Sequence, residues 1–252
     1  MVDKAILARN FSRHAHLYDK YAKVQRTAAE ALSAELPSGN IGRVLEIGCG
    51  TGIYTAILKE RFGAAQIKAI DISARAVAIA ADKIKGVNFA VCDAESARFT
   101  GAHDLVTSNS TLHWFGKLEL AVENYKAALS DKGVLLFSAF GPETFRELDS
   151  CLSEALKGRS ITSRRFADRL SLQAILRRHF QEVLVKETMV QREYGSLKEL
   201  LDTIRYTGTR GDGAQDGVIW RRTILREMED MYNKRFGRII ASYQIFICKA
   251  AG

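Results

Sequence analysis

A glycine-rich segment near residue 50 carries the strongest chemical signal in this sequence of 252 residues. Its sequence is Glu46-Ile-Gly-Cys-Gly-Thr-Gly52, between a short apolar run and a helical pattern. Glycines let the backbone turn tightly and approach a ligand, and the helix that follows presents unpaired N–H groups. The dinucleotide-binding fingerprint requires a glycine where Ile53 stands. A carboxylate two residues before the first glycine favours a cationic ligand over a pyrophosphate.

Acidic residues also follow the next two predicted strands. Asp71 ends one strand, and Asp93 follows the other, with Ala94 and Glu95 after it. A carboxylate at the first position can accept hydrogen bonds from both hydroxyls of a ribose, and one at the second can bind an adenine amino group. Each acid alone is as often a helix cap. Their order after the glycine loop favours the ligand-binding interpretation.

Strands and helices alternate through the first 140 residues, which predicts parallel strands joined by right-handed crossovers. The predicted strands are residues 43–48, 66–71, 87–92, 104–109 and 133–139, and the predicted helices are 15–36, 52–62, 73–85 and 117–129. The remainder predicts helices at 145–156 and 170–179, a strand at 182–192, helices at 196–206 and 220–233, and a last strand at 238–249. We therefore expect an α/β fold: a doubly wound mixed sheet with one antiparallel strand. The late helices should form a small insert above the carboxyl ends of the strands, where ligands bind.

The order and spacing of these motifs resemble the class I S-adenosylmethionine-dependent methyltransferases over about residues 43–139. The resemblance implies a Rossmann-like, seven-stranded sheet with S-adenosylmethionine as the cofactor. It also implies that Glu46 lies near the methionine end, Asp71 at the ribose and Asp93 at the adenine. The expected cofactor-binding residues are Arg13, Tyr18, Glu46, Gly48, Cys49, Gly50, Gly52, Asp71, Ile72, Asp93, Ala94 and Asn109.

Segments outside this core are similar to the malonyl-acyl-carrier-protein O-methyltransferases of biotin synthesis. They are Asn10-Phe-Ser-Arg13 with Tyr18-Asp19 and Gln25, Ser108-Asn-Ser-Thr-Leu-His-Trp114, residues 137–148, residues 197–201 with Thr207-Gly208, and the last strand around Tyr243. His113 departs from the glutamine found in much of that family. The resemblance implies methyl transfer to the free carboxylate of malonyl-acyl carrier protein. The ester would disguise the charged malonyl end, so that fatty-acid enzymes elongate it toward the pimeloyl chain of biotin.

A carboxylate acceptor is already ionised at neutral pH, so we expect no catalytic residue and attribute catalysis to alignment and desolvation. The substrate-binding candidates are Tyr18, Ser110, His113, Trp114, Arg146 and Arg205. We expect no metal, because the four cysteines are scattered without a metal-ligand spacing. The chain is predicted to form one domain over residues 1–252, with a helical lid (1–40), a cofactor-binding core (41–140) and a C-terminal half (141–252) that contains the insert at about 196–235.

The net charge of +8 favours an acidic partner, although a well-solvated surface explains it equally well. Acyl carrier proteins are acidic, so a basic face could steer one to the site; Arg221 and Arg222 are candidates within the arginine-rich C-terminal half. We expect neither nucleic acid nor membrane as a partner. The apolar runs are too short to span a bilayer and the N-terminus lacks the apolar core of a signal peptide, which predicts a cytoplasmic protein.

Several alternatives stay open on the sequence alone. One is a methyltransferase acting on another small carboxylic acid or on a quinone, and a less favoured one is an RNA methyltransferase. A third is a protein that binds the cofactor without catalysing transfer. The oligomeric state and the choice between carrier protein and coenzyme A thioester are not predicted.

Overall fold

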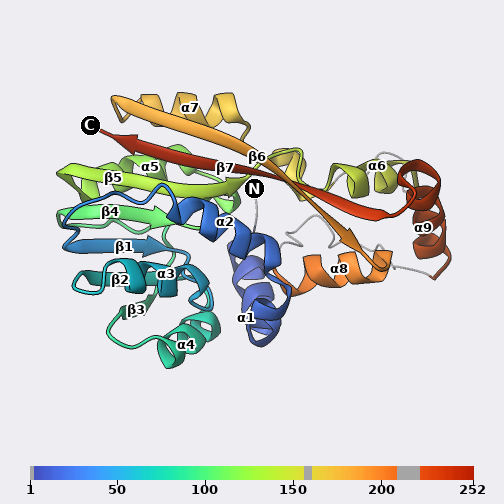
Figure 1. Ribbon diagram of the computed structural model, residues 1–252, viewed down its shortest axis with the longest axis horizontal. Helices are drawn as coiled ribbons and strands as arrows, with labels where there is room; N and C mark the ends of the chain where they lie inside the picture. The colour runs from blue at the N-terminus through green and yellow to red at the C-terminus, as the bar shows by residue number, and fades with distance from the viewer. Residues whose placement is uncertain (1–2, 156–160, 209–221) are drawn as a thin grey trace.

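A single seven-stranded sheet, in the order β3-β2-β1-β4-β5-β7-β6, organises the computed structural model, which describes residues 3–155, 161–208 and 222–252 (Figure 1). Strands β1 to β5 are parallel, whereas β7 runs antiparallel to both β5 and β6. This confirms the predicted mixed sheet with an antiparallel last strand. The strands are β1 (Arg43–Ile47), β2 (Gln66–Asp71), β3 (Asn88–Val91), β4 (His103–Ser108), β5 (Leu129–Phe140), β6 (Glu182–Tyr194) and β7 (Ile239–Ala251).

Helices cover both faces of the sheet, as a doubly wound fold requires. Consecutive residues of one strand face opposite sides: Val44 and Leu45 belong to separate clusters of buried apolar side chains, one on each face of the sheet. The helices are α1 (Lys4–Tyr21), α2 (Lys23–Ser33), α3 (Ile53–Arg61), α4 (Ala74–Lys83), α5 (Leu118–Ala128), α6 (Arg146–Ala155), α7 (Arg169–Arg177), α8 (Leu197–Tyr206) and α9 (Arg222–Phe236). Within the described residues, no helix has the length and apolar character needed to cross a membrane.

The N-terminal helices differ from the prediction of one helix over residues 15–36. The structure has two helices, which meet at Ala22, where ψ is 42° and the helix is interrupted. Helix α1 begins much earlier, because the Asp3 carboxylate accepts hydrogen bonds from the N–H groups of Ala5 at 2.8 Å and Ile6 at 3.1 Å. Most positions of α1 are polar, because only a narrow stripe of the helix packs against the rest of the protein. The apolar repeat that predicts a helix is therefore weak in this part of the sequence.

The parallel strands point their carboxyl ends toward α1 (Figure 1). Helices α8 and α9 occupy the connection between β6 and β7 and lie beyond that same end of the sheet, together with α6. Residues 209–221, between α8 and α9, lie outside the described residues, so the predicted helix start at residue 220 cannot be compared. Helix α1 therefore lies over the edge where a doubly wound sheet binds ligands.

Replacing Leu45 with alanine tests the packing of β1, the strand between β2 and β4. Leu45 is fully buried, and its truncation should lower the free energy of unfolding by about 2–5 kcal/mol because a cavity remains. Leu170→Ala is the control, because Leu170 is 74% exposed and its truncation should change little. Urea unfolding of both variants measures the difference, and equal effects would contradict this packing.

Candidate functional site

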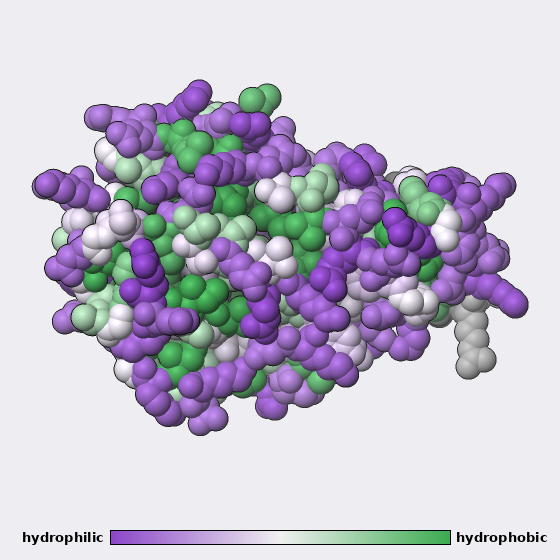
Figure 2. All heavy atoms as spheres, in the orientation of Figure 1, coloured by the Kyte–Doolittle hydropathy of each residue, from purple (hydrophilic) through white to green (hydrophobic). Residues whose placement is uncertain are grey.

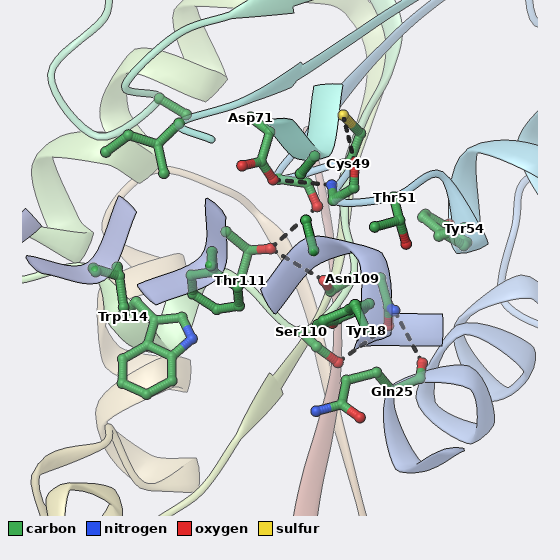
Figure 3. Close-up of a pocket in the computed structure, with 18 of the residues that line it drawn as sticks. Tyr18, Gln25, Cys49, Thr51, Tyr54, Asp71, Asn109, Ser110, Thr111 and Trp114 are labelled. Atoms are coloured by element: carbon green, nitrogen blue, oxygen red, sulfur yellow. Dashed lines mark hydrogen bonds between the residues drawn. The ribbon is translucent and has the colours of Figure 1, made fainter. Parts of the chain in front are cut away.

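A cavity lies between α1 and the carboxyl ends of β1 to β4 (Figure 3). The empty space between these elements, counted together with the open solvent at its mouth, is about 1010 Å³. The structure brings most of the predicted site residues into its wall. They are Tyr18, Gly48, Cys49, Gly50, Asp71, Ile72, Asp93, Ala94, Asn109, Ser110 and Trp114.

The glycine loop contributes backbone rather than side chains to this wall. Gly48, Gly50 and Gly52 all have positive φ angles, of 71°, 54° and 93°, which side chains disfavour. A Cβ on Gly48 would lie 2.1 Å from the Thr111 hydroxyl, and one on Gly52 would lie 2.8 Å from Ile84. A Cβ on Gly50 would meet nothing within 4 Å. The first and third glycines thus permit packing, whereas Gly50 leaves space in which a ligand can approach the backbone.

Asp71 is held in a fixed orientation at the end of β2. Its Oδ2 accepts a hydrogen bond from the Gly50 N–H at 2.9 Å, and its Oδ1 accepts one from the Ser73 N–H at 2.8 Å. Burial raises the pKa of Asp71, and these backbone donors oppose the rise. Each oxygen keeps a further lone pair, so the carboxylate fits the hydroxyl groups of a ribose.

Asp93, at the end of β3, forms an ion pair with α1. The Lys4 ammonium donates to both oxygens of Asp93, at 2.9 and 2.7 Å, and lies 2.8 Å from an oxygen of Glu95. Partial burial by itself raises the pKa of Asp93, but the hydrogen bonds from Lys4 and Ser96 hold it below its usual range. The Asp93 carboxylate is therefore ionised; it anchors α1 and forms part of the cavity wall.

Glu46 lies beneath the glycine loop rather than in the cavity wall. Its carboxyl group is buried, and Oε2 has no hydrogen-bond partner in the part of the chain that the structure describes. Burial raises the pKa of Glu46 to about 8; the Thr55 hydroxyl opposes the rise and Asp71 adds to it. A buried acid without a partner is costly, and a cationic ligand group nearby would stabilise its ionised form. Glu46 thus fits a ligand that carries positive charge.

Cys49 is not a nucleophile in this structure. Burial, with the nearby Glu46 and Asp71 carboxylates, raises the pKa of its thiol far above the usual range. The reactive species is the thiolate, so Cys49 stays protonated and contributes only shape to the wall.

The turn after β4 forms the other end of the cavity. The Asn109 side chain donates to the Gln25 carbonyl of α2 at 3.0 Å and accepts from the Ser138 hydroxyl of β5 at 2.7 Å. Ser110 has a φ of 53°. Positive φ angles are unusual for residues other than glycine, and such residues are often found at functional sites. Figure 3 shows these residues at the opposite end of the cavity from Asp71.

One stripe of α1 completes the wall. Lys4, Leu7, Phe11, Ala15 and Tyr18 line the cavity, and their spacing of three or four residues places them on one helix face. The Phe11 ring meets the Trp114 ring edge-on, with centroids 6.5 Å apart. Burial, reinforced by Asp71 and Asp19, raises the pKa of Tyr18, so its phenol remains a neutral hydrogen-bond donor.

Sequence reasoning missed much of this wall. It identified Tyr18 in α1, but gave no site role to Gln25 or to the other α1 residues that form the wall. The missed signal was the spacing from Lys4 to Tyr18, which would have been visible if the helix had been traced from Asp3. The other lining residues without a predicted site role are Thr51, Ile53, Tyr54, Ala76, Cys92, Glu95, Thr111 and Phe115.

Other predicted residues lie outside the wall, in addition to Glu46 and Gly52. Arg13 is exposed on α1. Arg146 is half exposed and pairs with Glu147 at 3.2 Å. The Arg205 guanidinium lies 5.8 Å from the centre of the Tyr206 ring.

His113 lies behind Trp114 rather than in the cavity wall. The two rings are 5.0 Å apart, and the His113 Nδ1 accepts a hydrogen bond from the Phe140 N–H at 3.3 Å. Burial lowers the pKa of His113 to about 3. The imidazole is therefore neutral and supports the position of Trp114.

Comparisons with known proteins agree with this geometry. A family model described as a methyltransferase domain matches residues 44–133. The chain is 33% identical to the malonyl-[acyl-carrier protein] O-methyltransferase of Acetivibrio thermocellus, over 98% of its own length and 94% of the relative's. It is 32% identical to the enzyme of the same name from Bacillus cereus, over 98% and 97% of the two chains.

Solved structures share the fold. The YcgJ protein of Bacillus subtilis superposes with a TM-score of 0.63 at 16% identity, over 88% of this chain and 97% of the other. Phosphoethanolamine N-methyltransferase 2 of Haemonchus contortus, solved with S-adenosylhomocysteine, gives a TM-score of 0.55 at 16% identity, over 91% of this chain and 53% of the other.

The sheet order, the glycine loop and the strand-end acids define a class I methyltransferase, whose cofactor is S-adenosylmethionine. The similarity over nearly the full length shows more: the chain belongs to the malonyl-[acyl-carrier protein] O-methyltransferase family. Both levels of the resemblance found in the sequence are thereby confirmed.

Replacing Glu46 with glutamine should stabilise the free protein and weaken cofactor binding. The folded pKa of about 8 exceeds that of the unfolded chain. As the pH rises from about 4.5 to 8, the unfolded chain therefore loses a proton that the folded protein keeps, and the free energy of unfolding falls by up to roughly 1.4 kcal/mol per pH unit. Glu46→Gln removes this loss, so its stabilisation should grow with pH.

Urea unfolding at several pH values measures this effect, with the exposed Glu60→Gln as the control. Calorimetry with S-adenosylmethionine measures the accompanying loss of affinity. If the wild-type and Glu46→Gln stability curves ran parallel between pH 5 and about 8, the buried, protonated state of Glu46 would be contradicted.

Proposed function

We propose that this chain transfers the methyl group of S-adenosylmethionine to the free carboxylate of malonyl-acyl carrier protein. The observation that carries the proposal is the 33% identity over 98% of the chain to an enzyme named for that reaction. The resemblance extends beyond the glycine loop and the strand-end acids to the Ser110 turn and to α1. The product would be the malonyl methyl ester that starts the pimeloyl chain of biotin, made in the cytoplasm without a nucleic acid or membrane partner.

The reaction makes few demands on protein side chains. When bound, S-adenosylmethionine supplies a methyl group on a sulfonium, and an ionised acceptor oxygen forms the new bond as the carbon–sulfur bond breaks. No proton has to be removed, so the protein's contribution is to align the two reactants and exclude water. The cavity suits that role, because α1 covers it and aromatic side chains form part of its wall.

We assign the cofactor to the end of the cavity with Gly50, Asp71 and Asp93. The acceptor then occupies the end with Tyr18 and Ser110, beside Trp114. Apart from Lys4, which is engaged by Asp93 and Glu95, no lysine or arginine lines the cavity in the described part of the chain. The acceptor carboxylate would therefore be oriented by neutral donors, which leaves its oxygen more nucleophilic than a tight ion pair would.

We also propose that residues 1–40 act as a lid within a single domain. Helix α1 supplies one wall of the cavity, and Gln25 of α2 is tied to Asn109. Binding and release of a ligand would therefore require this segment to move.

Methyl transfer from labelled S-adenosylmethionine tests the proposed reaction. The acceptors are malonyl-acyl carrier protein, malonyl-coenzyme A, free malonate and bulk RNA, assayed side by side. We expect a base-labile methyl ester that forms fastest on the carrier-bound acid. Label on free acids or RNA, with none on either malonyl thioester, would overturn the proposed acceptor.

Tyr18→Phe tests the acceptor end of the cavity. Loss of one hydrogen bond to a charged group costs about 1.5–3 kcal/mol, so kcat with malonyl-carrier protein should fall roughly 10- to 100-fold. The affinity for S-adenosylmethionine should fall much less. Tyr21→Phe is the matched control, because Tyr21 packs against Tyr206 of α8. An equal loss of kcat and cofactor affinity would contradict this assignment of Tyr18.

A further inference from the structure

The outer face of α1 carries a row of basic residues. Arg9, Arg13, His16 and Lys20 are exposed, and their spacing of three or four residues places them on one face of the helix. We call these four residues the α1 cationic ridge. It lies opposite the stripe of α1 that lines the cavity, because the two sets are offset by about half a helical turn.

The acidic residues of this segment, Asp3 and Asp19, are engaged elsewhere. Asp3 caps the N-terminus of α1, and Asp19 pairs with Lys83 at 2.5 Å and accepts a hydrogen bond from the Thr51 hydroxyl. No residue of the ridge forms an ion pair within the described part of the chain. The surface over α1 is largely hydrophilic (Figure 2).

Helix α8 packs against another side of α1, where Arg205 lies near the half-buried His14. The half-buried His14 packs edge-on against Tyr206, with ring centroids 5.2 Å apart. Burial lowers the pKa of His14, and Arg205, Arg13 and His16 lower it further. Helix α8 thus covers a side of α1 about a third of a helical turn from the ridge and leaves the ridge exposed.

The position of the ridge connects it to the cavity. An α-helix is about 10 Å across, so the ridge lies one helix thickness from the site where the acceptor must arrive. A partner held on the ridge would therefore lie within about one helix diameter of the cavity wall. Its bound acyl group could reach the cavity on a flexible arm.

We propose that the α1 cationic ridge is the docking surface for the acidic carrier protein. This inference rests on the proposed function. Carboxylates on the carrier would pair with the ridge, and the charge would also raise the rate of encounter. A membrane fits the ridge less well, because membrane-binding helices place large apolar side chains beside their cations, whereas Leu7 and Phe11 of α1 face the cavity. Arg221 and the side chain of Arg222, the docking candidates from the sequence, lie outside the described residues.

Two variants of the ridge give a graded test: Arg9→Gln/Lys20→Gln and Arg9→Glu/Lys20→Glu. The matched control is Arg61→Glu/Lys132→Glu, which reverses two exposed cations away from α1. Kinetics are measured with malonyl-carrier protein at low and moderate salt, and with malonyl-pantetheine, which carries the same thioester without the protein. Circular dichroism checks that the variants are folded.

We expect the KM for malonyl-carrier protein to rise about 5-fold in the neutral variant and about 20-fold or more in the reversed one. The salt dependence of this KM should weaken in both. Activity with malonyl-pantetheine and the KM for S-adenosylmethionine should stay within about 2-fold of wild type, because the ridge does not touch the cavity.

Failure of the proposed function and failure of the proposed docking surface would give different results. If the wild-type enzyme does not methylate malonyl-carrier protein, the proposed function is wrong. If it does, but the reversed variant keeps the wild-type KM and salt dependence, the docking surface is wrong. Equal losses with malonyl-pantetheine, or in the control variant, would also overturn the inference. So would binding to anionic vesicles or RNA that is lost in the variants while the carrier KM is unchanged.

Discussion

The packing of α1 across the carboxyl ends of the strands is the constraint on which the site depends. The polar contacts that hold the helix include the Lys4–Asp93 ion pair at 2.7 Å, the Ser12–Ser73 hydrogen bond between hydroxyls at 2.8 Å, and the Asp19–Lys83 ion pair at 2.5 Å. They tie α1 to the end of β3 and to both ends of α4. Without this cover the strand-end carboxylates would face water, where their electrostatic interactions are weak.

Ligand binding explains why the site contains two residues whose conformation or burial is unfavourable in the free protein. Glu46 is a buried acid without a described partner for Oε2, and Ser110 holds a φ angle of 53°. Each lowers the stability of the free protein. Both lie beside the cavity, one beneath the glycine loop and one at the proposed acceptor end. Such local conflicts are expected where a sequence is selected for binding rather than for stability.

The sequence predicted the sheet, and it predicted that Gly50, Asp71 and Asp93 come together in one site, because both depend on local patterns. Apolar strands that end in a glycine loop or an acid place their last residues at one edge whatever the details of packing. The direction in which a side chain points, by contrast, does not depend on the local sequence alone. Arg146 and Arg205 follow suitable elements, yet their side chains lie outside the cavity wall, and Lys4 enters it only because α1 begins at Asp3 rather than near residue 15. These placements depend on tertiary packing, which periodicity does not report.

Hydrogen–deuterium exchange with and without S-adenosylhomocysteine tests most directly the claim that α1 closes the cofactor site. S-adenosylhomocysteine should slow amide hydrogen exchange both in the glycine loop after β1 and along α1, because both form walls of one cavity. Protection in the glycine loop with no change in α1 would contradict this claim, since the cofactor would then bind to the sheet edge without the helix.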